Sequence, residues 1–180
     1  MGKIRGMNNL PANNCRNIVL IGMMGCGKTV VGQAISRKVS MPFIDTDTMI
    51  ETRLKMTIPH IFEQYGESYF RMIESEAAKE AASQAGVVIA TGGGMVMNPQ
   101  NMAVLGATGF IIYLRCNHKQ LYERTAGDKN RPLSDKLEEL LKLREPLYKS
   151  YSNFTIDSAT TSINRLAEMI WDEYCGNKRA

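Results

Sequence analysis

Residues 18–29 read IVLIGMMGCGKT, in which four apolar residues lead directly into a glycine-rich loop. The loop runs from Gly22 to Thr29 and fits the pattern G-x-x-x-x-G-K-[ST]. Apolar residues at helical spacing follow it, with Val30, Val31, Ala34 and Ile35 on one side. A strand, a glycine loop and a helix in this order form a phosphate-binding loop, because backbone N–H groups turn inward and the helix directs its positive end at the anion. The stretch therefore predicts a nucleoside-triphosphate site.

Two polar side chains at the end of the loop strengthen this interpretation. Lys28 supplies a mobile positive charge for the outer phosphates, and Thr29 offers a hydroxyl to Mg²⁺. An ordinary glycine turn would explain neither residue. Cys26 is interpreted either as a small loop residue or as a reactive thiol. The nucleotide contacts that we expect here are Gly25, Cys26, Gly27, Lys28, Thr29 and Val30.

Length and composition favour one soluble globular domain. The chain has 180 residues, of which 44% are hydrophobic and 22% charged. No apolar run reaches the ~20 residues of a membrane helix, and no apolar signal core is found near the start. We expect a flexible arm at residues 1–14, a single domain at 15–180, no membrane association and a cytoplasmic location.

Charge and metal-ligand counts exclude several function classes. The net charge of +4 fits either a basic surface for nucleic acid or arginines in a pocket for small anions. No basic run is present, so we favour the pocket and expect no nucleic-acid partner. The four cysteines form no C-x-x-C pair, and His60 and His118 belong to no motif. Neither a zinc site nor a catalytic histidine is indicated.

Alternating apolar runs and helical patterns predict an α/β fold. The five predicted strands are Ile18–Ile21, Phe43–Ile44, Val87–Ala90, Phe110–Leu114 and Phe154–Ile156. Several are apolar without alternation, which is typical of strands that are covered on both faces of a parallel sheet. Ligands of such sheets bind at the carboxyl ends of the strands. The polar residues that follow each strand are therefore the candidate site.

Two of these segments carry the strongest signals. Asp45 and Asp47 follow the second strand, where one carboxylate would serve Mg²⁺ and the other would take a proton from an acceptor hydroxyl. The alternative is an N-cap for a helix that starts at Met49. The triplet Gly92–Gly94 follows the third strand, where backbone N–H groups would hold a substrate; the alternative is a flexible turn before a helix near Asn98.

Two arginines on predicted helices are candidate anion ligands. Arg71 and Glu74 share a face of a helix over Glu67–Ser83, where an exposed ion pair is the simpler interpretation. Arg144 lies on an apolar helix stripe with Leu137 and Leu141. An inward arginine must either be paired in an internal salt bridge or reach a ligand such as a carboxylate.

Residues 124–133 form a polar, arginine-flanked connection between two helices. In a phosphoryl-transfer enzyme such a segment predicts a lid that excludes water and brings an arginine to the phosphates. The alternative is a solvated loop without a catalytic role.

Taken together, these residues resemble the shikimate kinases. The resemblance extends from the first predicted strand through the last predicted helix. It rests on Gly22–Thr29, on Phe-Ile-Asp-Thr-Asp at 43–47, on Gly66, Glu67, Phe70, Arg71 and Glu74, on Gly92–Gly94, on Arg131–Leu133, and on Arg144, Leu147 and Tyr148. The fold that it implies is the three-layer P-loop NTPase fold of the nucleoside monophosphate kinase type. This fold has a five-stranded parallel sheet with helices on both faces, a substrate-binding region at about 46–80 and a short lid at about 124–136.

The resemblance also implies a reaction and residue roles. ATP, with Mg²⁺, would phosphorylate the 3-hydroxyl of shikimate in the biosynthesis of chorismate and the aromatic amino acids, and the enzyme is expected to be a monomer. The implied catalytic residues are Asp47, Lys28 and Arg131. The implied shikimate ligands are Asp47, Arg71, Gly93 and Arg144. Thr29 and, through water, Asp45 would serve the metal, and Arg124 and Arg131 would contact ATP. Residues 158–162 would edge the adenine, where this chain has Ala-Thr-Thr in place of a frequent basic residue.

Two rival interpretations remain at this stage. A kinase for gluconate or a nucleoside monophosphate would share the phosphate loop, but two arginines with Asp47 favour a hydroxylated carboxylic acid. A guanine-nucleotide switch would require Asn-Lys-x-Asp, whereas this chain has Asp128-Lys129-Asn130.

Overall fold

The computed structural model describes residues 16–116, 121, 137–158 and 161–177. The predicted arm at 1–14, the predicted lid at 124–136 and part of the 158–162 loop therefore lie outside the described residues. In chain order the elements are β1 (Asn17–Ile21), α1 (Lys28–Val39), β2 (Phe43–Asp45), α2 (Thr46–Leu54), α3 (Ile58–Ser83), β3 (Val88–Ala90), the 3₁₀ turn η2 (Met95–Met97), α4 (Pro99–Thr108), β4 (Gly109–Arg115), α6 (Leu137–Tyr151), β5 (Phe154–Asp157) and α7 (Ile163–Asn177).

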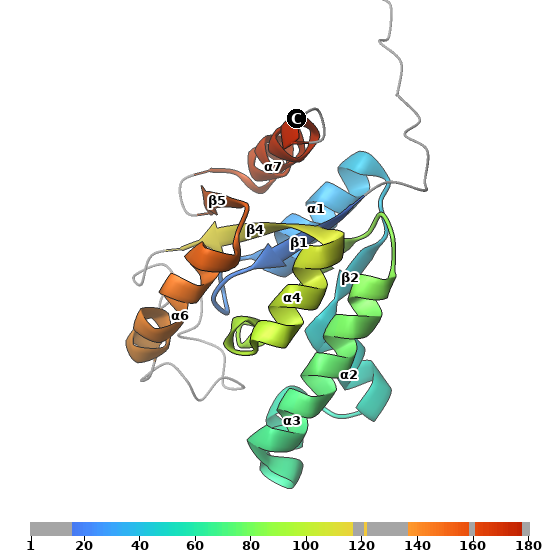
Figure 1. Ribbon diagram of the computed structural model, residues 1–180, viewed down its shortest axis with the longest axis vertical. Helices are drawn as coiled ribbons and strands as arrows, with labels where there is room; N and C mark the ends of the chain where they lie inside the picture. Colours follow the sequence, from blue (N-terminus) through green and yellow to red (C-terminus); the bar gives the residue numbers. More distant parts are fainter. Residues whose placement is uncertain (1–15, 117–120, 122–136, 159–160, 178–180) are drawn as a thin grey trace, which may run out of the picture.

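The strands form one parallel sheet in the order β2-β3-β1-β4-β5. All five predicted strands are confirmed, each within one residue at either end. Figure 1 shows α1 and α7 on one side of the sheet and α4 and α6 on the other, which makes three layers. Because every strand runs in the same direction, the segments that follow β1, β2 and β3 meet at one edge, and the sheet brings the candidate residues there together.

The core lies between these layers. Every residue of β1 and the first six residues of β4 are buried, as expected for central strands with helices on both faces. A second, smaller apolar cluster joins α2 to α3 and consists of Ile50, Ile61, Phe70, Ile73 and Ala77. This second cluster fixes α3, which carries Arg71 and Glu74, against the helix that carries Asp47.

Two local predictions need correction, and a third is confirmed. The helix after the second strand begins at Thr46 rather than Met49, because Asp45 caps it three residues earlier than expected. The predicted helix Glu67–Ser83 is confirmed as the second segment of α3, which is broken at Gly66 where φ is 79° and ψ is 174°. Val30 was expected on the buried side of α1 but is 47% exposed, since the buried side is formed by Val31, Ala34 and Ile35.

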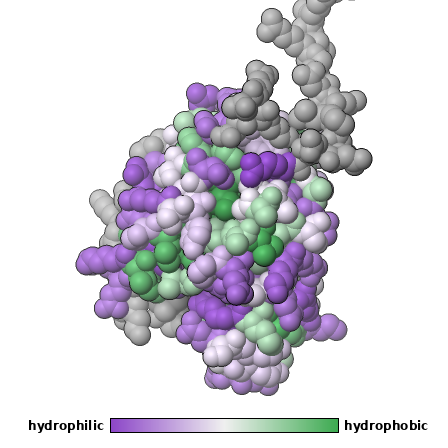
Figure 2. Space-filling view, viewed as in Figure 1, coloured by the Kyte–Doolittle hydropathy of each residue, from purple (hydrophilic) through white to green (hydrophobic). Residues whose placement is uncertain are grey.

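The surface carries both apolar and hydrophilic side chains. Figure 2 shows small green apolar areas among purple hydrophilic side chains on the face that Figure 1 presents. Among the described residues, no helix combines the length and the apolar character needed to cross a membrane.

Candidate functional site

The phosphate loop packs tightly on the sheet. Gly22 has φ of 146°, and a Cβ there would lie 2.6 Å from the carbonyl oxygen of Leu114. This close approach excludes a side chain at position 22. Gly27 is the N-cap of α1 in the left-handed conformation, with φ of 95°. The loop therefore ends at the N-terminus of a twelve-residue helix, which directs its positive dipole end at the loop.

Lys28 is folded back into the loop. Its Nζ donates to the carbonyl oxygens of Gly22 and Met23, both at 2.8 Å, and lies 3.7 Å from Cys26 Sγ. These contacts hold the cation at the loop, where the outer phosphates of a nucleotide would be bound. Cys26 is itself 1% exposed, which favours its interpretation as a small packing residue of the loop.

Thr29 and Asp45 connect the loop to the next helix. Thr29 Oγ1 donates to Asp45 Oδ2 at 2.7 Å. The other oxygen, Asp45 Oδ1, accepts from the backbone N–H groups of Asp47 and Thr48 at 3.0 and 3.3 Å. Asp45 is thus the N-cap of α2, as the alternative predicted, and it also accepts a hydrogen bond from the predicted metal-binding hydroxyl.

A cavity of about 540 Å³ opens above the loop. Lys28, Thr29, Asp45, Asp47 and Gly93 all contribute to its wall. Gly25, Cys26, Gly27 and the exposed Val30 line it as well, so every predicted nucleotide contact in 25–30 borders this space. Ser158 and Thr161, which both follow the last strand, line it from the side opposite to Asp47 along the sheet.

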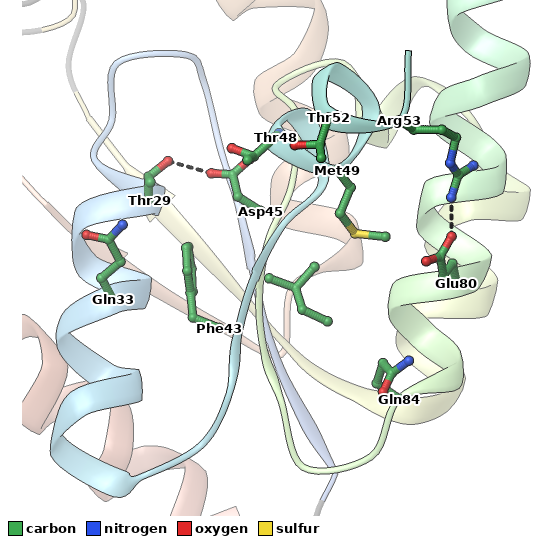
Figure 3. A pocket seen from close by; sticks show the side chains of 11 residues that line it. Thr29, Gln33, Phe43, Asp45, Thr48, Met49, Thr52, Arg53, Glu80 and Gln84 are labelled. Atoms are coloured by element: carbon green, nitrogen blue, oxygen red, sulfur yellow. Dashed lines mark hydrogen bonds and ion pairs between the residues drawn. The ribbon is translucent and has the colours of Figure 1, made fainter. Parts of the chain in front are cut away.

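A second hollow, of about 630 Å³, lies on the other side of the Thr29–Asp45 hydrogen bond. Figure 3 shows it between α1, β2, α2 and α3, with Phe43 and Met49 among the residues that line it. Its cation, Arg53, already pairs with Glu80. Although this hollow has the larger volume, Thr29 is the only residue of the phosphate loop that lines it and its cation is already paired, so the first cavity is the better candidate for an anion site.

Asp47 is the most perturbed carboxylate on this edge. Burial, together with the nearby Asp45 and Glu74 carboxylates, raises its pKa from 3.8 to about 6, although Lys28 opposes the shift. Its Oδ1 atom is buried and has no hydrogen-bond partner among the described residues. A buried carboxylate oxygen without a protein donor can accept a hydrogen bond from a hydroxyl or a water. A pKa close to neutrality fits a group that accepts a proton in a reaction.

Each glycine of the triplet lies close to a different part of the site. A Cβ on Gly92 would lie 2.6 Å from Asp47 Oδ1, and one on Gly94 would lie 2.4 Å from Arg71 Nη1. At Gly93 the nearest atom would be the backbone nitrogen of Met24, in the phosphate loop, at 3.2 Å. The triplet is therefore packed between the loop, the carboxylate and the arginine, and the alternative of a merely flexible turn is not supported.

Arg71 is held by two carboxylates. Its Nη1 donates to Glu74 Oε2 at 2.9 Å, and its Nη2 to Glu67 Oε1 at 3.0 Å. Burial lowers the pKa of Arg71, but Glu74 and Glu67 raise it by more, so the arginine stays charged. The expectation of an exposed ion pair is wrong for Glu74, whose side chain is 2% exposed and whose pKa burial raises despite Arg71. This geometry fixes Arg71 toward Gly94.

Arg144 is 7% exposed, as its place on the apolar stripe of α6 predicted. Its Nη1 donates to the carbonyl oxygen of Gly93 at 3.3 Å, while its buried Nε has no partner within the described part of the chain. In that same part no carboxylate lies within ion-pair distance of its guanidinium. The internal salt bridge is therefore not found, and the guanidinium keeps donors for an anion.

The structure adds two residues that sequence reasoning did not assign to the site. Thr46 Oγ1 accepts a hydrogen bond from the Gly92 backbone N–H at 3.0 Å, and Tyr148 Oη donates to the Gly93 carbonyl at 2.6 Å. In the sequence, Tyr148 was one of the residues that carry the family resemblance, without an assigned role, and Thr46 was part of the 43–47 segment. Since both side chains bond to backbone groups of a distant segment, their chemistry alone did not predict these partners. Arg124 and Arg131 lie outside the described residues.

The shikimate kinase family model matches residues 24–174 of this chain. A shikimate kinase of Ralstonia nicotianae is 43% identical over 160 residues, which cover 86% of this chain and 84% of the relative. A structure of the shikimate kinase of Acinetobacter baumannii in complex with shikimate has a TM-score of 0.88 at 37% identity, covering 93% of this chain and 99% of that one. A structure of the Aquifex aeolicus shikimate kinase has a TM-score of 0.81 at 31% identity, covering 90% and 98%.

Proposed function

The chain belongs to the shikimate kinase family, and we propose that the residues gathered at the carboxyl edge of its sheet carry out that family's reaction. The enzyme transfers the γ-phosphoryl group of ATP to the 3-hydroxyl of shikimate and releases shikimate 3-phosphate and ADP, a step in the formation of chorismate and the aromatic amino acids. One observation carries the assignment of the site. The partnerless, buried Oδ1 of Asp47 shares a cavity with Lys28 and borders Gly92, next to the triplet that Arg71 and Arg144 contact.

The nucleotide half of the site consists of the loop and the start of α1. Backbone N–H groups of Gly25, Cys26 and Gly27 and of the first turn, including Val30, would surround the phosphates. Lys28, now bonded to loop carbonyls, would exchange these acceptors for phosphate oxygens. Because the loop is already formed around the cation, little rearrangement is needed when ATP binds.

The residues present also fit a bound Mg²⁺. Thr29 Oγ1 and Asp45 Oδ2 are adjacent hard oxygen ligands at the wall of the cavity. No group of three or more acidic, histidine or cysteine side chains in the described residues would hold a metal by itself. Such a sparse protein ligand set is typical of Mg²⁺ that is bound with phosphates and water. When bound, this ion would neutralise charge on the phosphoryl oxygens.

Asp47 would position the acceptor and take its proton. Its Oδ1 needs a donor, and the hydroxyl of a bound acceptor would supply one. With a pKa of about 6, the carboxylate is ionised at neutral pH and remains basic enough to accept a proton as the hydroxyl attacks. In-line attack on the γ-phosphorus requires little more than this positioning.

The other half of the site would hold the substrate carboxylate. Arg71 is fixed by Glu67 and Glu74 next to Gly94, and the buried Nε of Arg144, whose Nη1 bonds to Gly93, has no partner in the described segments. Guanidinium groups pair with carboxylates through two parallel hydrogen bonds, which fix orientation as well as charge. The backbone N–H of Gly93 would add a third contact to the same ligand.

Some proposals concern residues or properties beyond this geometry. Arg131 would contact the transferring phosphoryl group from a lid at about 124–136, and Arg124 would pack near the adenine. We also propose a single kinase domain at 15–180, a monomer, a cytoplasmic location and no nucleic-acid partner. These proposals rest on the family resemblance and on the modest net charge of +4.

An acceptor panel tests the substrate assignment. ADP release should be measured with a coupled assay in the presence of Mg²⁺-ATP and either shikimate, gluconate or a nucleoside monophosphate. We expect turnover with shikimate but not with the other two acceptors, because two arginines next to Asp47 suit a hydroxylated carboxylic acid. A folded, ATP-binding sample that prefers gluconate or a nucleoside monophosphate would overturn the proposal, and one that binds ATP without turnover in any arm would support a binding module.

A further inference from the structure

The carbonyl oxygen of Gly93 accepts two hydrogen bonds from one helix. Tyr148 Oη donates to it at 2.6 Å and Arg144 Nη1 at 3.3 Å. The two side chains are four residues apart on α6, so they lie on the same face one turn from each other. The shorter bond belongs to the tyrosine, which therefore restrains the carbonyl more than the arginine does.

The backbone groups of the three glycines differ in whether they are hydrogen-bonded within the protein. The N–H of Gly92 donates to Thr46 Oγ1, and the carbonyls of Gly92 and Gly94 accept from Met95 and Met97. The N–H groups of Gly93 and Gly94 have no acceptor within the part of the chain that the structure describes. These two N–H groups are thus available to a ligand. The Gly93 carbonyl belongs to the same peptide unit as the Gly94 N–H, and side chains of α6 hold that carbonyl in place.

We propose that Tyr148 is a positioning residue for the phosphoryl acceptor. Its hydroxyl fixes the Gly93 carbonyl, and so sets the direction in which the neighbouring N–H groups and the Arg144 guanidinium face the substrate. Three consecutive glycines have no side chains to restrict their backbone, and the restraint has to come from outside the triplet. This inference rests on the proposed function of the site.

The surroundings of the hydroxyl make it a dependable donor. Tyr148 is fully buried, and its ring stacks on Tyr113 with centroids 5.0 Å apart and planes 19° apart. Burial raises the pKa of Tyr148 above its ordinary value, so it stays protonated at neutral pH. A second neighbour, Met23 Sδ of the phosphate loop, lies 3.6 Å away and is a weak acceptor. The hydroxyl therefore makes its shortest hydrogen bond to Gly93, next to the Arg144 side chain, and the ring keeps it in place.

The test compares Tyr148→Phe with Tyr113→Phe. Both changes remove one hydroxyl from the same buried ring pair, but only the first removes a bond to Gly93. For Tyr148→Phe we expect KM and the calorimetric Kd for shikimate to rise about fivefold to tenfold, the equivalent of one lost hydrogen bond. KM for ATP and kcat should stay within about twofold, since the only contact of this hydroxyl with the phosphate loop among the described residues is the long, weak one to Met23 Sδ. Tyr113→Phe should leave all of these constants unchanged.

Equal changes in the constants for both substrates, or the same effect from Tyr113→Phe, would show a general packing role and overturn the proposal. No effect of Tyr148→Phe would do so too. If Tyr148→Phe does not fold, the wild-type protein labelled with ¹⁵N-glycine decides: the Gly93 and Gly94 amide signals should shift on addition of shikimate, and their constancy would refute the inference. Failure of the wild type to phosphorylate shikimate would instead refute the proposed function.

Discussion

Replacing Asp47 with asparagine should stabilise the protein and inactivate it. The reason is the raised pKa of this carboxyl group, about 6 against 3.8, which is caused mainly by burial. Burial makes the ionised form of Asp47 unfavourable in the folded protein at neutral pH. Asparagine has nearly the same shape and never ionises, so it removes this unfavourable term together with the base.

The magnitude follows from the two pKa values. Below pH 3.8 the carboxyl is protonated in both states, and the stability associated with its proton is fully present. As the pH rises through about 6, the folded protein must release the proton that it binds more tightly than the unfolded chain does, and this stability is lost. At about 1.4 kcal/mol per pH unit, the difference between the two values gives about 3 kcal/mol. Asp47→Asn should therefore be more stable than the wild type by up to about 3 kcal/mol at pH 8, and by almost nothing near pH 3.5.

Urea unfolding of both proteins at several pH values measures this difference directly. In parallel, kcat/KM for shikimate in the wild type should fall about tenfold per pH unit below about pH 6, because the protonated Asp47 cannot act as a base. The variant should lose about 100-fold to 10,000-fold in kcat, the range for loss of a general base. A stability difference that does not change with pH, or a wild type more stable than Asp47→Asn at pH 8, would refute the reasoning.

Lys28→Ala should lower kcat by at least about 100-fold, since a preorganised charge at the phosphates is lost. Circular dichroism should still show a folded protein, and near-normal turnover would contradict the assignment of the phosphate loop. Arg144→Ala should raise KM for shikimate by about 100-fold with KM for ATP within about twofold, as expected for a charged hydrogen-bond donor; unfolding of this variant with shikimate affinity preserved would instead mark Arg144 as structural. Gly92→Ala should abolish turnover, because its Cβ would lie 2.6 Å from Asp47 Oδ1 and displace that carboxylate. Its control is Gly106→Ala in α4, where a Cβ meets Ile111 Cδ1 at an ordinary 3.5 Å; steady-state kinetics should show it unchanged, and equal losses in both variants would argue against the Asp47 contact.

The fold and half of the site follow from local patterns in the sequence. Five apolar runs predicted the strands because central parallel strands are buried on both faces. Arg144 was correctly predicted to face inward, since an arginine on an apolar stripe needs a polar destination. These predictions succeed where one residue's chemistry and its position along an element determine the outcome.

The remaining features depend on contacts between distant segments. Glu74 was expected in an exposed pair, but the packing of α3 buries it beside Asp47 and Gly92. The hydroxyl of Tyr148 reaches a backbone carbonyl 55 positions away, and no periodic pattern encodes such a contact. Val30 was placed on the wrong side of α1 because one turn of apolar residues does not reveal which side the sheet covers.

The most direct test of the proposed reaction is the identity of the phosphorylated product. The purified protein should be incubated with shikimate and Mg²⁺-ATP and the mixture followed by ³¹P NMR and mass spectrometry. We predict shikimate 3-phosphate and ADP in equal amounts. Little ADP should form when shikimate is omitted, because the acceptor completes the site around Asp47. ADP that accumulates without a phosphate ester, or an ester at another hydroxyl, would contradict the proposed reaction.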